Sequence, residues 1–572
     1  MCAITGFLGF EDKTLLKKMA STLKHRGPDA EAFYVDKNIS LAHRRLAIID
    51  LDTRSNQPMP NEDETIQVVF NGEIYNFHDL RPKLKSKHKF MTESDTEVIV
   101  HGYEEWGEAC VNKFNGMFAF AIWDSNKKKL FLARDRLGVK PLYYYVDNEK
   151  FIFASEIKAI LQAKFIKREV NTEAFYHYMT YLNTPAPSTL FKNIYKLEPG
   201  HTLTVTKNNE KITITKQKYW DIQNCKINPN ITEEEAIKKT RFLLEDSMRQ
   251  RMIADVPQGV FLSGGLDSSA LVAMMSERSE TPINTFSIAT GTDEKFNELK
   301  YAKIVAEKFS TNHHEYTIGH KEVLRALPEI VYHEDEPIAD PVNVPVYYLS
   351  KYARKEKVIV LQMGEGADEL FCGYPIYGLE AKTSPYSSFL RAVPPARLAA
   401  KAALSTITVV KKKSFFEHAK DHLESMKKPS EFSRRGIIGF TELEKKEILS
   451  EELKSPTLDS YNLFRNISNE VGGTGKDAFL QKVRIIELKN RLSELLLMRV
   501  DKFTMAASIE AREPFLDYKL AEHAFSIPPH SLHMKNGISK YILKKAIGQK
   551  LPQEIVNRKK VGFGVPIAKH LA

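Results

Sequence analysis

Short, largely apolar stretches recur through the first part of the chain. These stretches are rich in aromatic and β-branched residues, and Asn, Gly and Asp residues that favour turns separate them. The pattern predicts β-strands. The clearest are 40–51 (SLAHRRLAIIDL), 65–77 (TIQVVFNGEIYNF), 116–124 (GMFAFAIWD), 128–135 (KKLFLARD) and 150–157 (KFIFASEI).

The pattern changes to a helical period in the second part, beyond a stretch at 183–205 that Pro and Gly interrupt. An amphipathic helix is predicted over 233–252, and an earlier helix over 95–107. Strand, glycine turn and helix then follow one another, which predicts a parallel α/β core. Two domains are expected, 2–205 and 230–572. The buried strands predicted in the second are 259–262, 283–288 and 358–363.

Length and composition favour an ordinary globular enzyme of 572 residues, with 42% hydrophobic and 27% charged residues. No apolar run is long enough to predict a membrane span, and the N-terminus lacks the pattern of a secretory signal. The four cysteines have no paired spacing and no histidines beside them. Neither a disulfide framework nor a structural zinc site is therefore expected, and a reducing cytoplasm is the predicted location.

The net charge of +10 is uneven, because Lys and Arg outnumber Asp and Glu between residues 380 and 440. Such a stretch could face nucleic acid, a membrane or an anionic substrate, or it could form a solvated surface.

Cys2 directly follows the initiator methionine. Removal of Met1 would make Cys2 the N-terminus, and its α-amine, which titrates near neutral pH, could act as the base for its own thiol. The alternative is a small buried cysteine in a strand.

Four motifs follow Cys2 in a fixed order: HRGPD at 25–29, HRRLAIID with Arg45, NGEIYN at 71–76, and ESDTEV with Asp95. Each could be structural alone, since Asn-Gly forms turns and Asp caps helices. Together they resemble the class II glutamine amidotransferase domain, an N-terminal-nucleophile hydrolase with an αββα sandwich. The resemblance covers roughly residues 2–200.

The resemblance implies that Cys2 attacks the side-chain amide of glutamine and releases ammonia. It also implies an oxyanion hole made by the Asn71 side chain and the Gly72 backbone N–H. The implied glutamine-binding residues are Arg45 for the α-carboxylate, Asp95 for the α-ammonium, and Asn71 and Glu73 beside them.

A second motif, SGGLDSS at 263–269, comes directly after a predicted strand and opens a helix. Backbone N–H groups and hydroxyls at a helix N-terminus favour an anion. The Gly-Lys-Ser/Thr ending of a Walker A loop is absent. The motif resembles the pyrophosphate loop of N-type ATP pyrophosphatases, which split ATP between the α- and β-phosphates.

This second resemblance implies further site residues. Asp267 and Asp368 match the carboxylates that hold Mg²⁺, which prefers oxygen ligands. Glu365 matches a residue for forming the adenylate and admitting ammonia, and Lys540, expected on a helix, a residue that stabilises the α-phosphate. The implied ATP-binding residues are Leu262, Ser263, Gly264, Gly265, Asp267, Ser268, Ile288, Met363 and Gly364.

Taken end to end, the chain resembles the glutamine-hydrolysing asparagine synthetases. The implied fold is the αββα sandwich followed by a parallel α/β ATP-pyrophosphatase domain with added helices. The implied substrates are glutamine, ATP with Mg²⁺, and a carboxylate acceptor, aspartate first. Ammonia would cross an internal channel and displace AMP from the activated acid. Relatives of this layout often form homodimers, and the sequence leaves the oligomeric state open.

The sequence departs from many relatives at Met363, where Ser or Thr is common, and at Cys372, where Gly is common. One alternative is therefore the same chemistry on another carboxylate, such as a sugar (uronic) acid in polysaccharide biosynthesis. Two others are modification of nucleic acid, for which no RNA-binding module is found, and a front domain that is only a scaffold. The chain stops soon after VGFGVP, so a further C-terminal tail is also conceivable.

Overall fold

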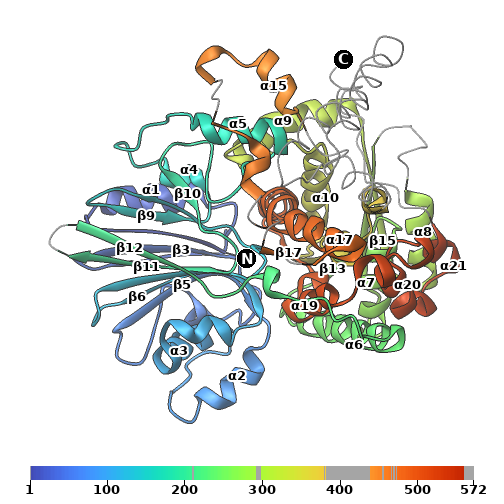
Figure 1. Cartoon of the computed structure of the whole chain (residues 1–572). Helices are drawn as coiled ribbons and strands as arrows, with labels where there is room; N and C mark the ends of the chain where they lie inside the picture. The colour runs from blue at the N-terminus through green and yellow to red at the C-terminus, as the bar shows by residue number, and fades with distance from the viewer. Residues whose placement is uncertain are drawn as a thin grey trace.

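The computed structural model contains two halves, one rich in strands and the other rich in helices (Figure 1). Most of the basic stretch 380–440, the VGFGVP segment and Met1 lie outside the described residues, so the predictions for them remain predictions. The structure describes residues 2–208, 211–290, 298–378, 381, 439–453, 457–464, 467, 470–471 and 473–558.

The first half contains two six-stranded antiparallel sheets (Figure 1). The five strands predicted from the short aromatic and β-branched stretches are all present. In sheet order, the first sheet is β10 (Ile194–Lys196), β8 (Tyr143–Val146), β9 (Phe151–Ala154), β1 (Ala3–Leu8), β3 (Ile39–Arg45) and β2 (Ala30–Val35). The second is β12 (Lys211–Lys218), β11 (His201–Asn208), β7 (Lys129–Arg134), β6 (Gly116–Asp124), β5 (Ile66–Ile74) and β4 (Met59–Pro60).

The two sheets share one hydrophobic layer, in which Ile4 of the first sheet and Val69 of the second are both buried. Helix α1 (Lys13–Thr22) packs on the outer face of the first sheet. Helices α2 (Phe77–Leu84) and α3 (Glu97–Trp106) pack on the outer face of the second. The central strand β1 is consequently buried along its whole length. This arrangement confirms the predicted αββα sandwich.

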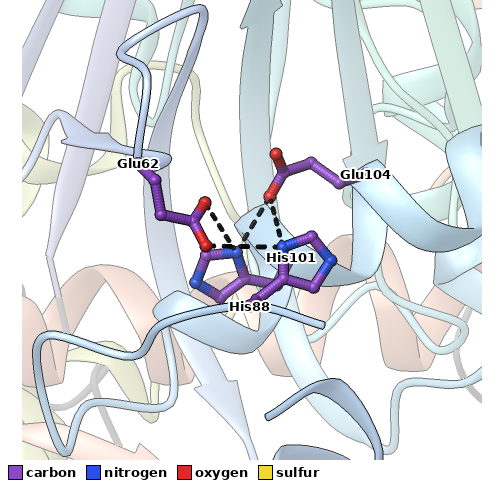
Figure 2. A group of neighbouring side chains, drawn as sticks. All are labelled: Glu62, His88, His101 and Glu104. Atoms are coloured by element: carbon purple, nitrogen blue, oxygen red, sulfur yellow. Dashed lines mark hydrogen bonds and ion pairs between the residues drawn. The ribbon is translucent and has the colours of Figure 1, made fainter. Parts of the chain in front are cut away.

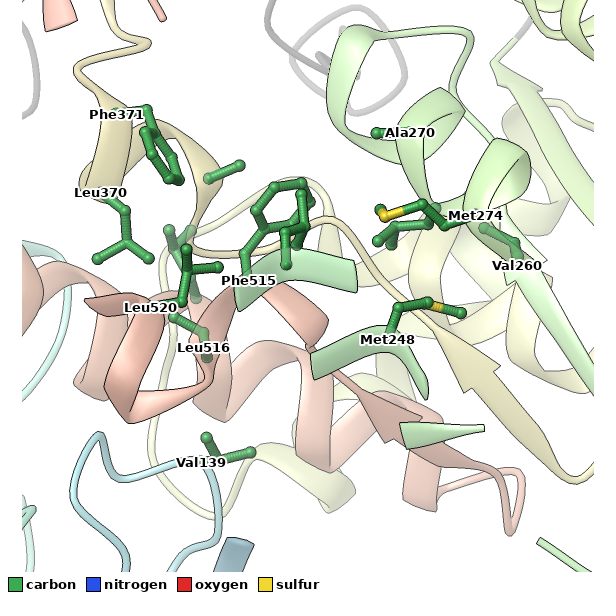
Figure 3. Close-up of a cluster of buried hydrophobic side chains, with 14 of the residues drawn as sticks. Val139, Met248, Val260, Ala270, Met274, Leu370, Phe371, Phe515, Leu516 and Leu520 are labelled. Carbon is green, nitrogen blue, oxygen red and sulfur yellow. The ribbon is translucent and has the colours of Figure 1, made fainter. Parts of the chain in front are cut away.

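The second half is built on a five-stranded parallel sheet, as the strand–turn–helix order predicts. One hydrophobic cluster covers one face and includes residues of α6 and α7 (Figure 3). A second cluster, with residues of α9, α10 and α18, covers the other face. The sheet order is β15 (Asn312–Ile318), β14 (Asn284–Thr290), β13 (Gln258–Phe261), β16 (Val360–Gln362) and β17 (Glu510–Arg512).

The helices of the second half begin with α6 (Glu233–Arg251), at the position that the amphipathic pattern predicts. A capping box between Thr232 and Glu235 fixes its start. The others that concern the site are α7 (Leu266–Ser276), α8 (Leu299–Lys308), α9 (His320–Glu334), α10 (Asn343–Lys355), α11 (Ala367–Phe371), α17 (Gly475–Ile486), α18 (Leu497–Met505), α19 (Tyr518–Ser526), α20 (Tyr541–Ile547) and α21 (Gln553–Asn557). Further helices among the described residues are α4 (Ile157–Ile160), α5 (Thr172–Tyr181) and α15 (Glu442–Ile448).

Buried ion pairs join the two halves. Arg26 Nη1 lies 2.7 Å from Asp501 Oδ2, and Lys140 Nζ lies 3.5 Å from the other oxygen of that carboxylate. Lys196 Nζ lies 3.1 Å from Glu494 Oε2. All five side chains are almost fully buried, so these pairs across the interface between the halves compensate charges that water cannot reach.

The predicted boundary at 205 falls inside β11, and β12 carries the second sheet on to Lys218. In the described ranges, none of the helices has the length and apolar character needed to cross a bilayer.

Candidate active sites

Cys2 lies directly before β1, close to the point where that strand faces β5 of the second sheet. Its backbone nitrogen donates a hydrogen bond to Asn71 Oδ1 at 3.2 Å. Its thiol lies 3.9 Å from the carbonyl oxygen of Leu46. Burial raises the pKa of the Cys2 thiol. The thiol therefore requires a base to become a nucleophile at neutral pH.

Asn71 and Gly72 lie side by side on β5. The Asn71 Nδ2 atom is buried and has no hydrogen-bond partner among the described residues. A buried donor without an acceptor costs about 1–3 kcal/mol, so this geometry points to an acceptor oxygen on a ligand. Gly72 has a φ of 151°, and a Cβ there would lie 2.0 Å from the carbonyl oxygen of Met117. Glycine is therefore required where β5 approaches β6.

Arg45, at the end of β3, and Asp95 line a small cavity of about 30 Å³ together with Cys2. Arg45 Nη1 donates to the carbonyl oxygen of Asp52 at 2.7 Å and to Asn56 Oδ1 at 2.9 Å. These contacts hold the guanidinium at the cavity wall.

Asp95 precedes α3 but does not cap it, since the N-cap position belongs to Thr96. Instead, Asp95 Oδ2 accepts a hydrogen bond from the Ile74 N–H at 2.8 Å. Burial raises the pKa of the Asp95 carboxyl to about 6. The carboxylate therefore lines the cavity and does not cap the helix, so the N-cap alternative is wrong for this residue.

Glu73 lines the same cavity, and its Oε1 lies 3.2 Å from Arg512 Nη2 on β17. Burial and the neighbouring Glu510 raise the pKa of the Glu73 carboxyl. A strand of the parallel sheet thus reaches into the wall of the first cavity, a contact that the motifs do not indicate.

The second cavity, of about 320 Å³, lies at the carboxyl ends of β13, β14 and β16. Open parallel sheets bind their ligands at this edge. Ser263 Oγ lies 3.1 Å from Ser268 Oγ and accepts a hydrogen bond from the Gly265 N–H. Gly264 and Gly265 shape the loop without lining the cavity. The predicted residues that line it are Leu262, Ser263, Asp267, Ser268, Ile288, Met363, Gly364, Glu365 and Asp368.

Lys540 lies between the two carboxylates predicted to hold Mg²⁺. Its Nζ is 2.6 Å from Asp267 Oδ2 and 2.7 Å from Asp368 Oδ1. It directly precedes α20, with a φ of 54°, whereas the sequence suggested a place on the helix. A Cβ on Gly373 would lie 1.8 Å from Asp368 Oδ1, so a glycine is required beside this pair. Two carboxylates facing one ammonium leave an excess negative charge that suits a hard cation.

Sequence reasoning missed the arginines of this cavity. Arg499 on α18 lies 2.7 Å from Glu365 Oε1 and 2.7 Å from Asp340 Oδ2. Arg491, in the π-helical segment Glu487–Leu496, also lines the cavity. The available signal was weak, namely a charged residue within an apolar helical stretch.

Known proteins match both halves of the chain. A family model described as a glutamine amidotransferase domain matches residues 1–220, and one described as asparagine synthase matches residues 239–572.

Two relatives come from Bacillus subtilis (strain 168). The asparagine synthetase [glutamine-hydrolyzing] 1 is 36% identical over 97% of this chain and 84% of its own length. The asparagine synthetase [glutamine-hydrolyzing] 3 is 31% identical over 98% and 86%. Among solved structures, the allosteric regulatory enzyme of purine biosynthesis matches with a TM-score of 0.31 and 14% identity, over 56% of this chain and 80% of that one. Because the sequence matches run through both halves in order, the chain belongs to the glutamine-hydrolysing asparagine synthetase family.

Proposed function

We propose that the protein is an ATP-dependent amide ligase that makes asparagine from aspartate with nitrogen from glutamine. The observation that carries the proposal is the combination of two sites in one chain. A thiol lies beside Asn71, whose Nδ2 has no hydrogen-bond partner among the described residues, and a carboxylate-lined cavity opens behind the serine–glycine loop.

In the first cavity, the Cys2 thiolate attacks the amide carbon of glutamine, ammonia leaves, and water hydrolyses the thioester to glutamate. Asn71 Nδ2 and the Gly72 N–H stabilise the oxyanion, and each such donor contributes roughly 3 kcal/mol in comparable sites. Arg45 brings positive charge for the substrate α-carboxylate, and Asp95 brings negative charge for its α-ammonium. Glu73, which contacts Arg512, helps to hold the end of glutamine that carries the α-amino and α-carboxylate groups.

In the second cavity, the side-chain carboxylate of aspartate attacks the α-phosphorus of ATP. Pyrophosphate leaves, and β-aspartyl-AMP is formed. Ammonia then attacks the acyl carbon and AMP leaves. The apolar wall formed by Ile288, Val346 and Leu349 suits the adenine base. The loop at Ser263–Ser268 receives the pyrophosphate, and Lys540 stabilises charge on the α-phosphate.

Mg²⁺ belongs to this proposal as the ion that Asp267 and Asp368 would hold. It would neutralise charge on the departing pyrophosphate. Glu365, which forms an ion pair with Arg499, is assigned two roles: it helps to form the adenylate and it admits ammonia.

Aspartate is favoured over a sugar acid because of where the departures from the family pattern lie. Cys372 is buried beside Tyr377 and Leu480 and does not line the second cavity. It has a φ of 55°, a conformation that glycine adopts more readily. This substitution therefore changes packing and not a substrate contact. Met363 does line the cavity, but its backbone N–H already donates to the Arg512 carbonyl.

We assign the reaction to the cytoplasm, because all four cysteines are free and a reducing compartment keeps them so. We propose no nucleic-acid partner. A homodimer stays a prediction.

The deciding experiment supplies ATP, Mg²⁺ and glutamine labelled with ¹⁵N in its amide, together with aspartate or a panel of sugar acids. We expect AMP and labelled asparagine in equal amounts with aspartate only. Formation of ADP would contradict an adenylate mechanism. Label in another amide, with none in asparagine, would contradict the assignment of aspartate.

The pKa of Asp95 predicts how glutamine use depends on pH. Burial raises this pKa to about 6, so the carboxylate loses its charge, and its attraction for the α-ammonium, as the pH falls below that value. We expect kcat/KM for glutamine hydrolysis to fall by about tenfold per pH unit there. The measurement is initial glutamate formation between pH 5 and 8.

The Asp95→Asn variant is the control for this dependence. It should show a raised KM throughout and no titration near pH 6. Because the folded pKa lies above the unfolded one, the proton stabilises the folded state, and that contribution is lost as the pH rises through about 6. The variant should therefore stay folded at pH 8. The same titration near pH 6 in wild type and variant would contradict the role of Asp95.

A further inference from the structure

Two histidines and two glutamates converge on one point of the first half, away from both cavities (Figure 2). Glu62 lies in the turn between β4 and β5, and His88 lies between α2 and α3. His101 and Glu104 lie on α3, three residues apart and so on one face of the helix. Three separate segments therefore each contribute a side chain capable of binding a metal.

Three of the four distances between these histidines and glutamates are close to those around a four-coordinate ion, and the fourth is a hydrogen bond. A tetrahedral site with bonds of about 2.0–2.1 Å separates its ligand atoms by roughly 3.4 Å. Here the Nδ1 of His88 lies 3.4 Å from Glu104 Oε2 and 3.5 Å from Glu62 Oε1. The Nδ1 of His101 lies 2.8 Å from Glu104 Oε2 and 3.7 Å from Glu62 Oε2. All four ligand atoms lie within 4.8 Å of one another.

Each histidine directs its second ring nitrogen at another carboxylate. His88 Nε2 lies within hydrogen-bond distance of Glu105 Oε1, at 3.2 Å, whereas His101 Nε2 lies 3.7 Å from Glu97 Oε1, which is too long for a hydrogen bond. A carboxylate behind the ring is the usual way that proteins orient a metal-binding histidine. Both Nδ1 atoms are thereby left to face the centre of the cluster.

Each of the two glutamates also accepts a hydrogen bond from a neighbouring residue. Glu62 Oε1 accepts a hydrogen bond from the Lys89 N–H at 2.9 Å. Glu104 Oε1 accepts one from Asn61 Nδ2 at 2.8 Å, while its other oxygen faces the histidines. All four side chains are thus positioned by groups that would not themselves bind an ion.

The charges in the cluster call for a cation. The two rings are stacked with centroids 4.6 Å apart, so placing a proton on each would bring two positive charges together. One divalent ion shared by two neutral rings neutralises the two facing carboxylates without that repulsion.

We propose that Glu62, His88, His101 and Glu104 bind one divalent transition-metal ion, with Zn²⁺ the best fit. Imidazole nitrogens and carboxylate oxygens in four-coordinate geometry suit Zn²⁺ and disfavour Mg²⁺ or Ca²⁺, which take oxygen ligands at higher coordination number. Four protein ligands leave no open position, so the ion is structural. The cysteine pattern predicted no structural zinc, and it could not detect a site made without cysteine.

The ion would join the turn at Glu62, the segment at His88 and the middle of α3. That segment leads to Ser94 and Asp95, which line the first cavity. Binding would therefore hold the wall that presents Asp95. The effect on Asp95 rests on the proposed function, but the binding of the metal does not.

The test measures metal content in the purified full chain after dialysis against metal-free buffer. Wild type should retain about one Zn²⁺ per chain, and Glu62→Gln and His88→Gln should each lose most of it. His78→Gln is the matched control, because His78 is exposed on the neighbouring α2 and should retain the ion. Glu62 is partly exposed, so its variant should fold normally.

A second measurement follows the thermal midpoint of the chelator-treated chain as ZnCl₂ alone is added. The midpoint should rise for wild type and for His78→Gln, and stay unchanged for Glu62→Gln. The Glu105→Gln variant, which alters only a group behind His88, should bind about 10–100-fold more weakly. Absence of bound metal and of any shift in wild type would overturn the proposal. Equal binding by wild type and Glu62→Gln would also overturn it, because the ion would then lie elsewhere.

Discussion

Glutamine-dependent amide formation is expected to fall at least about 10³-fold when Cys2 is replaced by alanine, because no other group can form the thioester. Synthesis from ammonia should stay within about twofold of wild type, since the second cavity contains its own polar groups. The measurement compares labelled product from amide-¹⁵N glutamine with labelled product from ¹⁵N ammonium chloride, at equal ATP.

Cys225→Ala is the matched control, since Cys225 is a half-buried thiol outside both cavities. It should leave both reactions unchanged. Glutamine-dependent synthesis that survives in Cys2→Ala would exclude the N-terminal thiol as the nucleophile.

Replacing Lys540 with methionine is expected to lower AMP formation about 10²–10³-fold with either nitrogen source, a size typical of removing one group that stabilises developing charge. The Lys540 ammonium is the cation between Asp267 and Asp368. Without it, two carboxylates face the incoming triphosphate and lack the ammonium between them, while Arg499 in the same cavity stays paired with Asp340 and Glu365. Release of AMP and pyrophosphate is measured with glutamine and then with ammonia.

Lys545→Met makes the same chemical change on the exposed side of α20 and should have little effect. Glutamine hydrolysis in Lys540→Met reports that the chain is folded, because the first cavity lies in the other half. An ammonia-dependent rate near that of wild type would remove Lys540 from the nucleotide site.

Much of the fold follows from local sequence patterns. The strands of the front sandwich are short apolar stretches rich in aromatic and β-branched residues, and α6 has both an amphipathic face and a capping box. The parallel sheet follows from strand, glycine turn and helix in succession. These features depend on residues close together in the chain.

The sites were only partly predictable, for the same reason. Motifs indicated Cys2, Asn71 and the serine–glycine loop, because their residues are consecutive or in a familiar order. Arg512, which contacts Glu73 from another sheet, and Arg499, which holds Glu365, are brought in by tertiary packing. The cluster at His88 and His101 likewise joins three segments whose spacing matches no metal motif.

The pair of Arg26 and Asp501 has a consequence for how this chain can evolve. The two residues are 475 positions apart. Glu156 also contacts Arg26 and Lys140 also contacts Asp501, yet a change at one residue alone leaves this buried network with an uncompensated charge, at a cost of about 3–5 kcal/mol. Substitutions at Arg26 and at Asp501 should therefore be inherited together. A chimera of this front half with the rear half of a distant homologue should fold only if it keeps matching charges at these positions.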